Sequence, residues 1–205
     1  FIDPRSSQVD IIQAVGRAIR LSPDKKAGTI VLPVFIKAGE NAIGTIEASN
    51  FKPVWDVLNA LKAHDDVLAC ELDQLRTDLG RKPGSGVSED GLGKIAVELP
   101  IHVEKSIGGV LRTHLVERAT ESWNFWFGLL EAFVEREGHA KVPRDYRTDD
   151  GYWLGNWVGR QRTEKDKLSP ERQVRLGALP GWSWNTIEDQ WEEGFRYLRE
   201  FENRE

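Results

Sequence analysis

The chain has 205 residues, of which 40% are hydrophobic and 30% charged, with a formal net charge of −5. No apolar run approaches the length of a membrane span, and no signal-peptide core is found, so we expect an ordered cytoplasmic protein without a membrane partner. A single cysteine, Cys70, excludes an internal disulfide framework, and the four histidines lack ligand spacing, so we predict no bound metal and a small buried side chain at Cys70.

The first predicted elements form a strand–helix–strand unit within residues 1–40. Residues 1–3 read as the end of a strand, Ser6 or Ser7 can cap the helix that follows, and Ser22-Pro23 ends it. Residues 29–36 are almost all apolar and rich in β-branched side chains, which is typical of a buried strand in a parallel sheet. We therefore expect α/β structure here.

A polar stripe runs along one face of the predicted helix, at positions i, i+3, i+4 and i+7: Gln13, Gly16, Arg17 and Arg20. An apolar stripe lies on the other side. Two guanidiniums that project together suit the neutralisation of phosphoryl charge, because they stay ionised and pair bidentately with phosphate oxygens. Solvated surface arginines are the alternative, since the pattern Q-x-x-G-R-x-x-R is short.

Residues 3–20 closely resemble motif VI, with its lead-in, of bacterial superfamily 2 DNA helicases of the DEAD/DEAH-box type. The resemblance implies that residues 1–40 are the end of a second RecA-like lobe. It also implies that Gly16, Arg17 and Arg20 contact the nucleotide, the two arginines as fingers that reach the γ-phosphate of ATP held by the first lobe. Gln13 would help to order the attacking water or the phosphate.

The motifs of a first lobe are absent from the sequence, including the phosphate-binding loop and the Asp-Glu box for Mg²⁺. The chain has no methionine and starts with Phe1 in what reads as the middle of a strand. We therefore expect the C-terminal part of a longer enzyme, or an incomplete gene model. ATP and Mg²⁺ are the implied cofactors of the full-length enzyme, and the N-terminal RecA-like lobe is an implied partner; this fragment alone should bind no cofactor and hydrolyse no ATP.

Residues 41–118 are predicted to form a mostly helical connector. Apolar stripes at helical spacing mark residues 54–61 and 67–79, a short strand is expected at 95–103, and a helix near 107–120. The Gly-rich stretch 80–93 is followed by a lysine but fails the phosphate-loop template, since Ser88 stands where glycine is needed and Ile95 where Ser or Thr is needed. A flexible linker or surface loop is expected there.

An internal repeat lies in the tail of the chain, with a displacement of 68 positions. The residues Trp123, Phe127, Leu130, Phe133, Arg136 and Glu137 recur as Trp191, Phe195, Leu198, Phe201, Arg204 and Glu205. Each copy carries an apolar helix face. The second copy, residues 186–205, is expected to be the first helix of a truncated repeat.

Four sequence patterns mark the first copy of the repeat and the segment that follows it. They are WFGLLEAFVEREGHAKVP at 126–143, GYWLGNWVGRQR at 151–162, LSPER at 168–172 and LPGWSW at 179–184. With them, residues 119–185 resemble the bacterial helicase-associated domain, a three-helix module predicted to bind nucleic acid. Helices are expected near 123–137, 151–165 and 169–178, the last capped by Ser169 before Pro170. Leu154 and Val158 form an apolar face with Trp157, so we expect Trp157 and Trp153 in the core rather than as base-stacking platforms.

Basic residues gather in this module. From residue 138 to residue 176, 9 Lys and Arg stand against 6 Asp and Glu, a local charge of +3 that leaves −8 for the rest. Cationic groups on a small helical module suit phosphate contacts, so nucleic acid is the expected partner, and the resemblance favours DNA. The candidate contact residues are Lys141, Arg144, Arg147, Arg160, Gln161 and Arg162. Solvated surface charge is the alternative for each.

The sequence thus predicts an α/β partial RecA-like lobe followed by mainly α structure, with the three-helix module near the C-terminus. The implied function is the C-terminal part of an ATP-dependent DNA helicase or translocase. Two competing interpretations are a non-enzymatic nucleic-acid-binding module and a protein-docking module.

Overall fold

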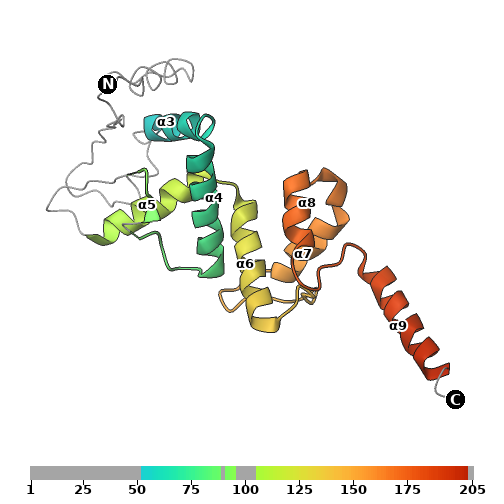
Figure 1. Cartoon of the computed structure of the whole chain (residues 1–205). Coiled ribbons are helices and arrows are strands. Elements are labelled where there is room, and N and C mark those ends of the chain that lie inside the picture. Colours follow the sequence, from blue (N-terminus) through green and yellow to red (C-terminus); the bar gives the residue numbers. More distant parts are fainter. Residues whose placement is uncertain (1–51, 89–90, 96–104, 203–205) are drawn as a thin grey trace. The chain divides into compact units, whose positions relative to one another are not determined.

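A computed structural model describes residues 52–88, 91–95 and 105–202 (Figure 1). In these ranges the chain forms seven α-helices, one short 3₁₀-helix and no strand. Within the same ranges, no helix combines the length and the apolar character needed to cross a membrane. The predicted RecA-like lobe at 1–40, with its motif VI, lies outside the described residues, and so does almost all of the strand predicted at 95–103.

The chain divides into two compact units. Of the described residues, 52–79 and 84–125 belong to the first unit, and 80–83 and 126–202 to the second. Each unit is described by itself below.

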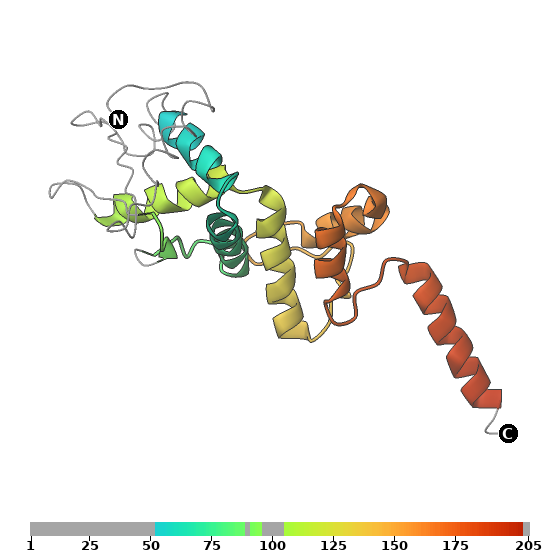
Figure 2. The ribbon, with the colours of Figure 1, turned by 45° about the horizontal axis from the view of Figure 1, so that its top comes forward.

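Three helices build the first unit: α3 (Lys52–Lys62), α4 (Asp66–Arg81) and α5 (Lys105–Ala119), with α3 against α5 (Figure 2). They confirm the helices predicted from the apolar stripes. Leucines and valines at helical spacing meet in one core, in which the side chains of Leu72 and Val116 are fully buried. The Nζ of Lys62 donates to Asp73 Oδ1 at 3.1 Å and to the carbonyl of Ala119 at 2.8 Å, which links the three helices.

Asp65 caps α4 at its N-terminus. Its Oδ1 accepts a hydrogen bond from the Leu68 backbone N–H at 3.0 Å, and its Oδ2 lies 2.7 Å from Lys94 Nζ. Lys94 follows the Gly-rich stretch 80–93. The ion pair therefore anchors the end of this stretch to the start of α4.

Gly80 and Arg81 still belong to α4, whereas the described residues 82–88 and 91–93 of the Gly-rich stretch form turns and irregular structure, apart from a single 3₁₀ position at Gly91. Val87 and Leu92 are buried in the core, so these parts of the stretch are not the surface loop that was predicted.

The second unit contains α6 (Ser122–Glu137) from residue 126 onward, α7 (Leu154–Thr163), the 3₁₀-helix η3 (Lys165–Lys167), α8 (Pro170–Gly177) and α9 (Thr186–Glu202). Its core is formed by buried apolar residues of α6, α7 and α8, among them Leu130, Leu154, Val158 and Leu176, each at 0% exposure. The three helices therefore share one core, to which each of them contributes at least one fully buried side chain. The three predicted helices of the module are confirmed.

Helix boundaries in this module follow local chemistry. Ser169 is the N-cap of α8, with its side chain accepting from the Arg172 N–H and Pro170 in the first turn, as predicted. By contrast, α7 starts at Leu154 rather than at residue 151, because Gly151 has a φ of 84° and forms a turn in which its N–H donates to the Thr148 carbonyl at 2.8 Å.

Two burial predictions are wrong. Cys70 is exposed. On α4 the buried side chains of Leu68 and Leu72 lie on one face of the helix, and Cys70 is two residues from each of them. Two residues correspond to a rotation of about 200° round a helix, so Cys70 lies on the opposite face. Trp153 is 46% exposed, because it precedes the first residue of α7 and so does not share the buried face of that helix.

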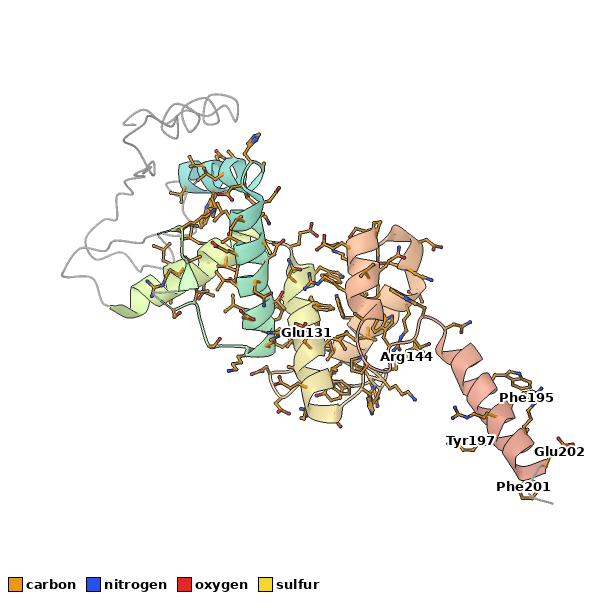
Figure 3. All side chains as sticks on the ribbon, in the orientation of Figure 1. Glu131, Arg144, Phe195, Tyr197, Phe201 and Glu202 are labelled. Atoms are coloured by element: carbon orange, nitrogen blue, oxygen red, sulfur yellow. The ribbon has the colours of Figure 1, made fainter. Side chains whose placement is uncertain are left out.

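The repeated helix face has opposite environments in its two copies. In α6, Trp123, Phe127, Leu130 and Phe133 are 7%, 3%, 0% and 6% exposed. In α9, Trp191, Phe195, Leu198 and Phe201 are 76%, 51%, 68% and 67% exposed. Figure 3 labels Phe195 and Phe201 on α9. The helix predicted for residues 186–205 is therefore present, with its apolar stripe facing solvent in this structure.

Candidate nucleic-acid interface

The second unit carries a groove of about 1450 Å³. Its walls come from Trp126 on α6, from residues 141–144, from α7 with the residues just before and after it, and from residues 181–185. The cationic, aromatic and acidic side chains that line it are Lys141, Arg144, Arg160, Arg162, Trp126, Trp153, Trp157, Trp184 and Glu164. Small-molecule pockets are usually ~300–1000 Å³, so the size of the groove suits a polymer better than a small ligand.

Glycines allow the loop after α6 to lie against α7. Gly138 has a φ of 77°, a left-handed conformation that turns the chain at the end of α6. A Cβ atom added to Gly155 would overlap the carbonyl oxygen of Pro143 and lie 2.5 Å from that of Arg144. The backbone of this loop therefore rests directly on the first turn of α7, which places Arg144 in the same groove as Arg160.

Three of the predicted contact residues are exposed cations in this groove: Lys141, Arg144 and Arg160. Arg144 is labelled in Figure 3. In the described part of the chain no carboxylate forms an ion pair with any of the three. Glu164, the acidic residue of the lining, lies 3.4 Å from Lys167 instead. The groove therefore offers cationic groups that are available to an anionic ligand.

Arg147, a fourth predicted contact residue, is held by an aromatic ring. Its guanidinium carbon lies 3.4 Å from the centre of the Trp153 ring, a cation–π contact on an indole that itself lines the groove. Arg147 is exposed. It supports the tryptophan and adds positive charge beside the groove.

Gln161 and Arg162 have internal roles. Gln161 is 5% exposed, and its Nε2 donates to the Trp157 carbonyl at 3.4 Å, so its amide faces the interior of the module. The Nε of Arg162 donates to the Ser183 carbonyl at 2.9 Å, and the guanidinium carbon lies 5.0 Å from the centre of the Trp182 ring. Arg162 therefore joins α7 to the segment after α8 while forming part of the wall of the groove.

Tryptophans form the rest of the groove. Trp157 is half-buried and stacks on Trp126, with ring centroids 6.2 Å apart and an interplanar angle of 11°. Trp184 packs edge-on against Trp182 at 5.2 Å, and Lys165 Nζ lies 5.2 Å from its ring centre. Neither Trp126 nor Trp184 was predicted as a site residue, and Trp184 lies outside the helices, where helical spacing gives no signal.

A further hydrogen bond fixes the loop beside the groove. The Nη2 of Arg136, at the end of α6, donates to the Tyr146 hydroxyl at 2.6 Å, and its Nε donates to Glu137 at 2.8 Å. These contacts, the Tyr146 hydroxyl first, raise the pKa of Arg136. Because Arg136 lies outside the groove lining, it positions the loop rather than the ligand.

The implied nucleotide-contacting residues Gln13, Gly16, Arg17 and Arg20 lie outside the described residues, so their predicted roles stay predictions.

Comparison with known proteins gives one family match. No curated protein and no solved structure matches the chain significantly. The family model of the helicase associated domain matches residues 120–185, which contain α6, α7 and α8. The groove lies within this range.

Proposed function

We propose that residues 120–185 bind nucleic acid in this groove, as part of an ATP-dependent DNA helicase or translocase. The observation that carries the proposal is the meeting of Lys141, Arg144 and Arg160 in one groove, without carboxylate partners in the described part of the chain. Cations of this kind bind backbone phosphates, displace counterions and give affinity without sequence preference. The family match to a helicase associated domain supports the same function.

The motor part of the proposal rests on residues 3–20, which resemble motif VI of superfamily 2 helicases. In the complete enzyme, ATP with Mg²⁺ lies between two RecA-like lobes. Arg17 and Arg20 stabilise the charge on the transferring phosphoryl group, with Gly16 beside the nucleotide and Gln13 at the attacking water. The groove keeps hold of the DNA while nucleotide hydrolysis moves the lobes.

Salt-dependent binding tests the role of the groove. The full chain is titrated against a labelled DNA duplex and a labelled single strand between about 50 and 200 mM salt. Replacing Lys141 and Arg160 together by alanine should weaken binding. It should also lower the log–log salt slope by about 1 for each phosphate that the protein no longer neutralises.

The matched control replaces an exposed lysine and an exposed arginine that do not line the groove, Lys82 and Arg118, by alanine. This variant loses the same charge, so it should keep most of the affinity if binding is local to the groove. Equal weakening by both pairs would show that only net charge matters and would contradict the proposal.

The gene sequence upstream of the codon for Phe1 tests the motor part of the proposal. An open reading frame that continues upstream of Phe1 should encode a G-x-x-x-x-G-K-[ST] loop and an Asp-Glu box. An upstream sequence without either motif would remove the ATPase from the proposal and leave the nucleic-acid-binding module.

A non-enzymatic docking function is a second candidate, because α9 exposes Trp191, Phe195, Leu198 and Phe201 on one helix. A chain that does not bind DNA at low salt but binds a protein partner through this helix would favour the docking function.

A further inference from the structure

The groove is aromatic as well as cationic, and this combination points to the form of the nucleic acid. Trp153, Trp157 and Trp184 line it together with Lys141 and Arg160. Indole faces bind nucleic acid by stacking on bases, whereas cations bind backbone phosphates. A groove that offers both is suited to a ligand whose bases and phosphates are accessible at once.

We propose that the groove binds single-stranded nucleic acid, with unpaired bases stacked on its tryptophans and the backbone held by the neighbouring cations. This inference rests on the proposed function and specifies its ligand. In a duplex, each base face is covered by the next base pair, so stacking on an indole requires a base that is already unpaired or is flipped out at a cost. The exposed indole of Trp153, with the half-buried Trp157 and Trp184 in the same groove, therefore favours the single strand.

Trp153 is the strongest platform among them. It is 46% exposed, lines the groove, and has the guanidinium of Arg147 over its ring at 3.4 Å. The guanidinium occupies one face of the indole, so a base has to stack on the opposite face. A base that stacks there completes a sandwich of guanidinium, indole and base, in an orientation that Arg147 has already fixed.

The neighbours of Trp153 extend the platform along the groove. Trp157 lies one helical turn further along α7 and is held in place by its stack on Trp126. Arg160 follows three residues later on the same helix, exposed and without an ion-pair partner in the described residues. A single strand that follows α7 thus meets an indole, a second indole and a cation in order.

The test separates bases from phosphates by using three labelled probes with the full chain. The first is an oligothymidylate of about 12 nucleotides, within the ~4–16 nucleotides that one single-strand-binding fold covers. The second is an abasic strand of the same length, and the third is a hairpin duplex with the same number of phosphates. Affinities are measured by fluorescence anisotropy at fixed low salt.

Trp153→Ala should weaken oligothymidylate binding about tenfold and weaken binding to the abasic strand much less, because stacking is lost while the cations Lys141, Arg144 and Arg160 remain in the groove. Trp153→Phe should keep most of the affinity. Trp191→Ala removes an even more exposed tryptophan that does not line the groove, and it should change neither affinity.

Two results would overturn the inference. In one, Trp153→Ala weakens binding to the abasic strand as much as binding to oligothymidylate, which would make the indole a structural support. In the other, the wild-type chain prefers the duplex. Salt-dependent binding with equal affinity for oligothymidylate and for the abasic strand would contradict this inference but not the proposed function. Failure to bind any of the three probes at low salt would contradict both.

Discussion

The guanidinium of Arg147 lies over the indole of Trp153, 3.4 Å from its centre, although the two side chains are both exposed. Exposed side chains usually move between rotamers, but this contact gives the indole a preferred orientation at the rim of the groove. The pair therefore combines a fixed aromatic surface with a positive charge at the place where we expect the ligand.

A double-mutant cycle should detect this contact in the free chain. The substitutions Arg147→Ala and Trp153→Ala, alone and combined, are expected to give a coupling free energy of about 0.5–1 kcal/mol, as for exposed cation–π pairs. The measurement is the free energy of unfolding from urea titrations followed by circular dichroism. A coupling of zero would mean that the guanidinium does not hold the indole in solution.

Two glycines one turn apart on α7 should respond in opposite directions to alanine. At Gly155 the new Cβ would overlap the carbonyl oxygen of Pro143, so we expect a loss of about 2–3 kcal/mol from overpacking. At Gly159 nothing lies within 4 Å of the new Cβ, so Gly159→Ala should gain about 0.5–1 kcal/mol from the higher helix propensity of alanine. Urea unfolding of both variants checks the prediction, which similar changes at the two positions would contradict.

The two copies of the repeat offer a matched pair for the cost of cavities. Leu130 is fully buried, and Leu130→Ala should lose about 2–5 kcal/mol of unfolding free energy. Leu198 occupies the same place in the repeat but is 68% exposed, so Leu198→Ala should change stability by less than about 0.5 kcal/mol. A large loss at Leu198 would show that the stripe of α9 is covered in solution, by this chain or by a second copy.

Acid should weaken the start of α4. The hydrogen bond from Lys94, followed by that from the Leu68 backbone N–H, holds the pKa of Asp65 below its ordinary value of 3.8. Because the folded chain prefers the carboxylate, this contribution is present above the unfolded pKa and is lost as the pH falls from about 4 through the lower folded value. Carboxyl NMR of the wild type should show a titration midpoint below 3.8.

Lys94→Ala should move that midpoint back toward the ordinary value, since it removes the largest cause of the shift. Asp65→Asn should flatten the acid side of the urea midpoint plotted against pH. An Asp65 midpoint at or above 3.8 in the wild type would contradict the ion pair.

The sequence was most informative where apolar residues recur at helical spacing. The stripes at 54–61 and 67–79, the repeated face from Trp123 to Phe133 and the Ser169-Pro170 start all correspond to observed helices. These signals are local, since a helix is specified by its own face and caps. The same periodicity placed Cys70 off the buried stripe, so its exposure could have been predicted.

The groove could not be predicted in the same way, because its parts come from four separate segments of the chain. Trp153 lies just before α7, where helical spacing carries no information, and its contact with Arg147 depends on the turn at Gly151. Gln161 looked like a surface residue between two arginines but falls on the stripe of Leu154 and Val158, so it is buried. Local patterns showed which residue types were present, but only the fold showed which of them meet.

The exposure of Cys70 has a practical consequence. The sequence contains this one cysteine, and its thiol lies at the surface of α4. A maleimide dye should therefore attach once per chain without any engineering, on the unit that does not contain the groove. In oxidising buffer the same thiol limits covalent assembly of this chain to pairs, because a chain with one sulfur can form one bridge and no more.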